Sequence, residues 1–260
     1  MVLRFFNYVG NTVIQFFSLV GSFTIFVLNV IKTCFSTKLK FGKFFVQSER
    51  IGVNSFFITI ITGGFAGAVL ALQSYKGFQK FGGEEFIGSV VALSMIRELG
   101  PVLTGLMVAG RSGSAIAAEL GSMRISEQID ALKTLCIDTY QYLVVPRILA
   151  GTLILPFLAL FAMMFGILGG YLVFTKILGL NGEEYSSGIK EFVEIWDVIG
   201  GLIKSAVFGF LLTAIGAYKG YKTKGGARGL GIATTQSVVS GSILIIISNY
   251  FLAMILFGPS

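Results

Sequence analysis

The sequence contains no histidine and only two cysteines among its 260 residues. The lack of histidine excludes Ser-His-Asp catalysis and histidine-ligated metal sites together. Cys34 and Cys136 lie far apart, so neither a disulfide framework nor a Cys-x-x-Cys site is supported. No nucleophile–base set for an intramembrane enzyme is evident. The sequence therefore predicts a protein without a cofactor or metal, and not an enzyme.

Charge is also scarce. Only 13% of the residues are charged, 54% are hydrophobic, and the mean hydropathy is +0.83. A soluble domain of this length lacks enough polar side chains to cover such a surface, whereas uncharged runs of about 20 residues can cross a bilayer. These runs are far longer than the alternating segments, of about ten residues, in a membrane β-barrel. We therefore expect an all-α integral membrane protein.

The net charge of +7 reflects basic residues gathered between the apolar runs. That pattern is typical of topology signals rather than of nucleic-acid binding. It puts the basic segments 32–50 and 219–228 in the cytoplasm and the acidic loop 176–197 outside. No cleavable signal peptide stands out.

We expect five membrane spans. Residues 86–122 are too long for one straight helix, which would reach roughly 55 Å against a hydrocarbon core of about 30 Å. Proline suits the first turn of a helix and not its interior, so Gly100-Pro101 is the natural break. A partly embedded helix is expected at 86–98, and the C-terminus outside. The predicted spans are 51–75, 101–122, 146–174, 198–218 and 232–257.

Residues 5–31 are uncharged, but their polar side chains recur at steps of three, four or seven. Such spacing forms one polar stripe on a helix, which favours a helix lying in the membrane interface. A spanning helix is the alternative and would move only the N-terminus. The stripe consists of Asn7, Asn11, Gln15, Ser18, Ser22 and Asn29. We thus divide the chain into residues 1–50, the interfacial helix with a basic cytoplasmic segment, and 51–260, the transmembrane domain.

The stretch RISEQIDALKTLCID (124–138) is too short and too polar to cross the membrane. Its apolar residues form one stripe, so it predicts a short amphipathic helix on the cytoplasmic side. We expect Ser126 to be its N-cap, with Glu127 at the positive helix end. The stripe consists of Ile125, Ile129, Leu132 and Leu135.

Small residues are regularly spaced in GLMVAGRSGSAIAAELGS (105–122). Part of it is close to the phosphate-loop pattern GxxxxGK[ST], but it has Arg in place of Lys and no strand precedes it. Rows of small residues at every fourth position instead favour close helix packing. One row is Gly105, Ala109, Gly113, Ala117 and Gly121; the adjacent row is Gly110, Ser114, Ala118 and Ser122; a third is Gly63, Gly67 and Ala71.

Five charged residues fall in or near the predicted membrane segments: Arg97, Glu98, Arg111, Glu119 and Lys204. Each costs about 2.5 kcal/mol or more in hydrocarbon unless it is paired or hydrated. Arg111 and Glu119 lie toward the cytoplasmic end, where water reaches them. Arg97, Glu98 and Lys204 are the better candidates for a polar substrate cavity, with structural ion pairing as the equal alternative.

Two long stretches carry a family resemblance. They read ELGPVLTGLMVAGRSGSAIAAELGSMRISEQIDALKTLCIDTYQYLVVPRILAG (98–151) and GLGIATTQSVVSGSILIIISNYFLAMILF (229–257). Both resemble the MlaE-type permease family, the membrane subunits of ABC transporters that move lipids, and the resemblance covers most of residues 50–258. It implies a homodimer, a separate ATPase on the cytoplasmic or stromal face, and a lipid-binding partner with a mammalian-cell-entry (MCE) domain on the other side.

The resemblance also implies roles for particular residues. Arg97 and Glu98 would lie near the lipid-binding cavity, and residues 5–31 would be the family's interfacial helix. One departure is Asn249, because many members have an acidic residue there, which puts any role that needs a carboxylate in doubt. The coupling helix that docks on the ATPase would contain Ser126, Glu127, Gln128, Ile129, Asp130, Ala131 and Leu132.

An ion-coupled secondary transporter is the alternative function. It predicts unwound helices in two corresponding halves and a buried acid in each, whereas the sequence shows one Gly-Pro break and no clear repeat. The 25 phenylalanines, with abundant Ile and Lys, are typical of an AT-rich genome. This favours a plastid inner envelope, with a bacterial inner membrane as the close alternative.

Overall fold

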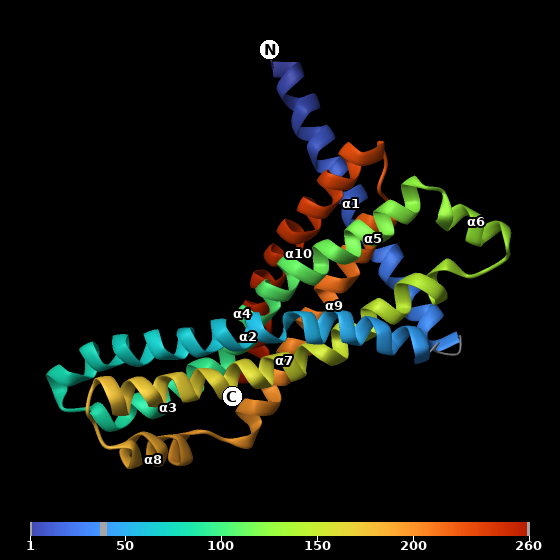
Figure 1. Ribbon diagram of the computed structural model, residues 1–260. Helices are drawn as coiled ribbons and strands as arrows, with labels where there is room; N and C mark the ends of the chain where they lie inside the picture. The colour runs from blue at the N-terminus through green and yellow to red at the C-terminus, as the bar shows by residue number, and fades with distance from the viewer. Residues whose placement is uncertain (1, 37–40, 259–260) are drawn as a thin grey trace.

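The computed structural model describes residues 2–36 and 41–258; the side chains of residues 2–9, 12, 15 and 16 lie outside the description. Every regular element in these ranges is helical, and six helical stretches are long and apolar enough to cross a membrane (Figure 1). The all-α integral membrane fold is confirmed. The six stretches are Phe17–Ser36, Phe41–Phe81, Glu84–Ile125, Tyr140–Ile177, Ile195–Tyr221 and Gly226–Phe257.

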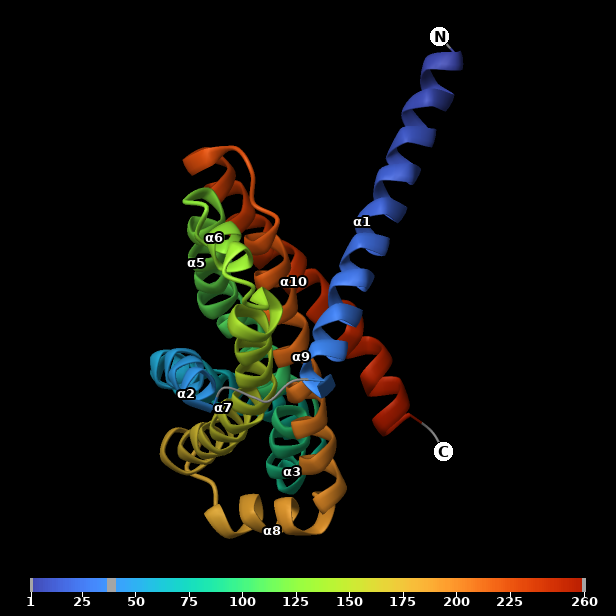
Figure 2. The same ribbon diagram turned by 90° about the vertical axis from the view of Figure 1, so that its right-hand side faces the viewer.

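The α-helices are α1 (Val2–Ser36), α2 (Phe41–Phe78), α3 (Ile87–Ser94), α4 (Gly100–Val108), α5 (Ser114–Ile125), α6 (Gln128–Thr134), α7 (Val145–Leu172), α8 (Gly182–Phe192), α9 (Ile195–Tyr221) and α10 (Gly226–Phe257). The π-helical turns are η3 (Met95–Leu99), η4 (Ala109–Gly113), η5 (Tyr140–Val144) and η6 (Val173–Ile177). Two 3-10 turns, η1 (Gln79–Phe81) and η2 (Glu84–Phe86), connect α2 to α3. Figures 1 and 2 both place α6 and α8 at opposite ends of the bundle.

The predicted break at Gly100-Pro101 is wrong. Leu99 and Gly100 both have right-handed helical dihedrals, and the chain stays helical from Glu84 to Ile125. Pro101 has no N–H to donate to the carbonyl of Arg97, four residues earlier. Lys204 Nζ donates to that carbonyl instead, at 2.8 Å. The π-helical turn η3 ends at Leu99, just before Gly100-Pro101, and the axis of α5 is inclined to that of α3 (Figure 1).

Small residues bring α2 and α7 together. A Cβ atom on Gly67 would lie 1.9 Å from the carbonyl oxygen of Gly166, and one on Gly63 would lie 2.6 Å from that of Ala162. Ala71 is fully buried. The close packing predicted for the row Gly63, Gly67 and Ala71 is confirmed, because no larger side chain fits between these backbones.

The segment expected as an acidic outer loop contains α8. Asn181 caps this helix by accepting a hydrogen bond from the Glu183 N–H. Tyr185 is buried against Phe174, and its hydroxyl donates to the carbonyl of Ile167 at 3.1 Å. This burial raises the pKa of Tyr185. Helix α8 therefore closes the end of the bundle opposite α6.

Helix α1 contacts the bundle through its second half. Phe26 and Val30 are buried, and Phe26 packs against the rings of Tyr218 and Tyr221. Of the predicted polar stripe, Ser22 hydrogen-bonds Tyr218, whereas the side chains of Asn7 and Gln15 lie outside the description. Lys38 and Lys40 of the basic segment 32–50 also lie outside the described residues. The interfacial placement of α1 therefore stays a prediction.

Candidate functional site

Arg97, Glu98 and Lys204, the three predicted cavity residues, lie together. Arg97 and Glu98 belong to η3, and Lys204 comes from α9. Lys204 Nζ is 2.8 Å from Glu98 Oε1. Arg97 Nε and Nη2 each lie 2.7 Å from Oδ1 of Asp197, in the first turn of α9. We call these four residues the inner cluster.

The inner cluster has two buried members and two half-exposed ones. The side chains of Lys204 and Asp197 are 0% and 2% exposed, whereas those of Glu98 and Arg97 are 40% and 38% exposed. Two cations and two carboxylates leave no net charge, which lowers the cost of placing them among apolar helices. The buried pair holds the half-exposed pair in place, and the half-exposed pair is open to a ligand.

Helix α10 completes the inner cluster. Asn249 Nδ2 donates to Glu98 Oε2 at 2.9 Å. The ring centroid of Phe257 lies 5.2 Å from Arg97 Cζ and 5.6 Å from Lys204 Nζ, within the range of cation–π attraction. An ionised carboxylate at position 249 would have no proton to donate to Glu98. The amide of Asn249 therefore makes a hydrogen bond to Glu98 that an aspartate at this position could not make.

Sequence reasoning assigned Asp197 to the outer loop and missed its part in the site. No standard sequence signal marks this residue, because the usual capping box has Ser or Thr followed three residues later by Glu or Gln. Asp197 accepts a hydrogen bond from the Glu194 N–H at 3.0 Å, and the Glu194 side chain accepts one from the Asp197 N–H. These two reciprocal hydrogen bonds form a capping box at the start of α9, with Glu and Asp in place of the usual Ser or Thr and Glu or Gln.

A second charged group joins α2, α5 and α7. We call it the outer cluster, a name that does not refer to the outer side of the membrane. Glu119 lies between two arginines, with Oε1 3.0 Å from Arg50 Nη1 and Oε2 2.9 Å from Arg147 Nη2. Arg147 is 4% exposed and also donates to the carbonyl of Leu143. Sequence reasoning missed Arg147, although it stands at the start of an apolar run. Arg111 lies in η4 with an exposed side chain.

The row Gly105, Ala109, Gly113, Ala117 and Gly121 is buried throughout. It faces α9 and α10: a Cβ on Gly220 would lie 2.8 Å from the Ala117 carbonyl oxygen, and Ser237 Oγ donates to the Gly113 carbonyl at 3.1 Å. The adjacent row differs, since Gly110 and Ser122 are exposed and a Cβ on Gly110 would meet no atom within 4 Å.

The amphipathic helix predicted within residues 124–138 is shorter in the structure, where α6 covers only Gln128–Thr134. Ser126 is not its N-cap; its N–H and hydroxyl both bond the Ser122 carbonyl and close α5. Helix α5 continues to Ile125, so two residues must reverse the chain, and Glu127 adopts a left-handed conformation with φ 59°.

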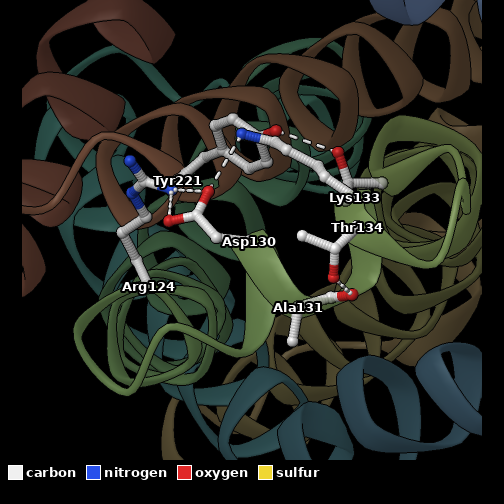
Figure 3. A network of polar contacts seen from close by, with 7 residues as sticks. Arg124, Asp130, Ala131, Lys133, Thr134 and Tyr221 are labelled. Carbon is white, nitrogen blue, oxygen red and sulfur yellow. Dashed lines mark hydrogen bonds and ion pairs between the residues drawn. The ribbon is translucent and has the colours of Figure 1, made fainter.

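Ion pairs and an apolar contact fix α6 on the bundle. Asp130 accepts hydrogen bonds from Arg124 at 2.6 Å and from Lys133 at 3.2 Å (Figure 3). The bond from Arg124, and then that from Lys133, lower the pKa of Asp130. Ile129 is fully buried and Leu132 partly so, whereas Ile125 and Leu135 of the predicted stripe are exposed. Ser126, Glu127, Gln128 and Ala131 face solvent.

The sequence matches the family described as Permease MlaE over residues 44–255. The chain belongs to the MlaE permease family. It is therefore a multi-pass membrane protein and a component of a transporter. The match begins inside α2, and the domain boundary expected at residue 51 stays a prediction. Nowhere in the described ranges do three or more His, Cys, Asp or Glu side chains gather as metal ligands.

Relatives align along most of the chain. A probable ABC transporter permease protein of Rickettsia bellii is 46% identical over 257 residues, 99% of each chain. The intermembrane phospholipid transport system permease protein MlaE of Haemophilus influenzae is 33% identical over 259 residues, again 99% of each. The chloroplast protein TRIGALACTOSYLDIACYLGLYCEROL 1 of Arabidopsis thaliana is 38% identical over 211 residues, 81% of this chain and 60% of that one. The family resemblance seen in the sequence is confirmed.

Proposed function

We propose that this chain is the permease subunit of an ABC transporter that moves phospholipids, driven by a separate ATPase. The inner cluster is the observation that carries the proposal. A charged, half-exposed pair held by two buried partners is costly inside a membrane bundle, and such costs are typical of substrate sites. The relative named for phospholipid transport supports this substrate class.

Within the inner cluster, Arg97 is the proposed phosphate contact. A guanidinium bonds phosphate oxygens through two parallel N–H groups. Asp197 uses Nε and Nη2 of Arg97, and 38% of that side chain remains exposed. Lys204 and Asp197 act as positioning residues, because both are buried behind the groups that a lipid reaches.

Helix α6 is the proposed coupling helix. Its exposed residues Gln128 and Ala131, and Glu127 just before it, are available to an ATPase, and only two residues separate α6 from α5. Because α5 packs along α9 and α10 through small residues, a displacement of α6 is transmitted to helices that also build the inner cluster.

We further propose a homodimer, with an MCE-domain protein at the α8 end of the bundle. The apolar face of α10 is uncovered in the single chain: Val239, Ile243 and Tyr250 are 52%, 51% and 68% exposed. The same helix supplies Asn249 to the inner cluster. A second copy packed on α10 would enclose the half-exposed pair between two protomers.

A secondary transporter is less well supported. Such a protein needs unwound helices at its substrate site. At the inner cluster the chain stays helical from residue 84 to residue 125, and the π-helical turn before Pro101 does not unwind it. The buried acid Asp197 is ion-paired with Arg97.

We propose a bacterial inner membrane as the compartment, ahead of the plastid inner envelope that composition alone favours. The support is that the relatives from Rickettsia bellii and Haemophilus influenzae align over 99% of this chain, whereas the chloroplast relative, like the one from Synechocystis, aligns over 81%.

The test is to express the chain with a candidate ATPase and a candidate MCE-domain protein and purify the complex. We expect a stable assembly that contains two copies of this chain and moves phospholipid between vesicles only when ATP is hydrolysed. Failure to form a complex, or transfer that follows an ion gradient without ATP, would refute the proposal.

A further inference from the structure

A groove with two chemically different halves runs between α2 and α7. Its first half is a cavity of about 550 Å³. Its second half is an apolar cavity of about 260 Å³, lined by Val53, Phe57 and Phe157 among others. The basic and polar residues lining the first half are Lys43, Gln47, Arg50, Glu119, Tyr142 and Arg147.

Both cavities are lined by residues of α2 and α7, and the first lies nearer the start of each helix. On α2, Lys43, Val46, Arg50, Val53 and Phe57 follow one another at steps of three and four residues. Residues with this spacing lie on one face of a helix, in order along its axis. That face is basic at Lys43 and Arg50 and becomes aromatic at Phe57, about two helical turns after Arg50. On α7 the order is the same, from Arg147 near its start to the aromatic residues Phe157 and Phe161.

The first half carries excess positive charge. Lys43, Arg50 and Arg147 face a single carboxylate, Glu119, which both arginines share. Lys43 Nζ lies 3.0 Å from the ring centroid of Tyr142, so it is held at the rim of the cavity. Arg147 is 4% exposed, and its Nε finds no hydrogen-bond partner among the described residues. A buried donor beside unneutralised cations points to an anionic ligand.

The second half excludes a purely soluble anion as the occupant. Val53, Phe57 and Phe157 are 65%, 76% and 62% exposed, and all lie in stretches that are apolar enough to cross a membrane. Such a surface is complementary to hydrocarbon chains. Phosphate and hydrocarbon, joined at the spacing of two helix turns, are the chemistry of a phospholipid.

We propose that this groove binds one anionic phospholipid of the leaflet that faces the basic loops. Its phosphate contacts Lys43, Arg50 and Arg147, and an acyl chain lies along Val53, Phe57 and Phe157. The site is separate from the inner cluster, which is built by η3, α9 and α10. Lipid binding in this groove requires only that the chain lies in a bilayer, so it does not depend on which substrate is transported.

The experiment uses tryptophan quenching by brominated lipids. The chain has one tryptophan, Trp196. In a Trp196→Phe background, Phe57→Trp places a reporter in the groove, and the full chain is reconstituted in phosphatidylcholine vesicles. We expect brominated phosphatidylglycerol to quench this reporter at a mole fraction about fivefold lower than brominated phosphatidylcholine does, since one basic contact near the membrane surface accounts for roughly that factor. A matched reporter, Phe65→Trp, lies further along α2 beyond the groove and is 71% exposed in the native chain. It should show no preference.

Charge variants separate this site from general attraction to a basic protein. Lys43→Gln and Arg50→Gln, singly and together, should lower the preference at the Phe57→Trp reporter toward one. Lys76→Gln, at the other end of α2, should leave it unchanged. Either single variant suffices if the double variant does not fold by gel filtration. Equal quenching by both lipids, or a preference that survives both substitutions, would overturn the proposal. So would a reporter quenched by neither lipid, because the groove would then be covered by protein.

Discussion

The inner and outer clusters are both groups of charged residues among membrane helices, but they are balanced differently. In the inner cluster, two cations meet two carboxylates, and each buried member has a partner of opposite sign. In the outer cluster, one carboxylate serves two arginines, and Arg147 keeps an unpartnered N–H within the described part of the chain. The inner cluster is therefore neutralised by its own residues, whereas the outer cluster keeps an excess of positive charge.

The clusters also differ in what holds them. Lys204 of the inner cluster donates to the Arg97 carbonyl, which Pro101 cannot hydrogen-bond. Its ammonium group therefore also stabilises the backbone of the helix at this point. The outer cluster makes its main contacts between side chains of three helices. We therefore expect substitution of the buried Lys204 to affect folding and transport together, substitution of the half-exposed Arg97 to affect mainly transport, and substitutions in the outer cluster to affect mainly local packing.

The largest effect is expected for Lys204→Met. It leaves Glu98, which is 40% exposed, without its cation, and it leaves the Arg97 carbonyl without its donor; together these losses should cost about 3 kcal/mol of stability. The check is the thermal unfolding midpoint in detergent, with Lys176→Met as the exposed control. A Lys204→Met protein as stable as the control would contradict the expectation that the inner cluster contributes to the stability of the fold.

A smaller effect is expected for Glu119→Gln. It leaves the buried Arg147 without its ionic partner, but the glutamine side-chain oxygen can still accept a hydrogen bond from Arg147, which compensates in part. We predict a loss of about 2 kcal/mol. The same unfolding measurement tests this, and the loss should shrink when Arg50→Gln is added, because repulsion between two unneutralised arginines is then relieved. A loss as large as that of Lys204→Met would contradict the ranking.

Asn249→Asp tests the charge balance of the inner cluster. The new carboxylate would stand where an amide now donates to Glu98 at 2.9 Å, and repulsion should cost about 1–2 kcal/mol at neutral pH. In a double-mutant cycle with Glu98→Gln this cost should vanish. An equal cost with and without Glu98 would show that the two side chains do not interact.

The smallest effect is expected at α6, outside both clusters. The pKa of Asp130 is lowered from 3.8 by the bonds from Arg124 and Lys133, so its contribution to stability is present above pH 3.8 and is lost as pH falls through the lower, folded value. Asp130→Asn should remove this part of the acid dependence of the unfolding midpoint. Glu127→Gln, in the adjacent turn, is the control; identical acid profiles for both variants would disprove the role of Asp130.

Composition and spacing were enough to predict the helices and the packing of Gly63 and Gly67. They were not enough at Pro101. Local rules predict a break there, and the structure avoids it through Lys204, a residue distant in sequence whose donor no local pattern reveals. Helix α8 was missed because most of its residues are polar and its stability depends on burying Tyr185. Asp197 was missed for two reasons: Glu194 and Asp197 do not match the usual Ser/Thr-x-x-Glu/Gln capping pattern, and its ionic partner Arg97 is distant in sequence.

The most direct test of the account is ATP-driven phospholipid transfer by the reconstituted complex that carries Arg97→Gln. We predict that the complex assembles and hydrolyses ATP while transfer falls at least about tenfold, as expected when a charged contact to the phosphate is lost. The matched control, Lys76→Gln, should transfer lipid at the native rate. Transfer that is unchanged in Arg97→Gln would show that the inner cluster is structural and that the substrate lies elsewhere.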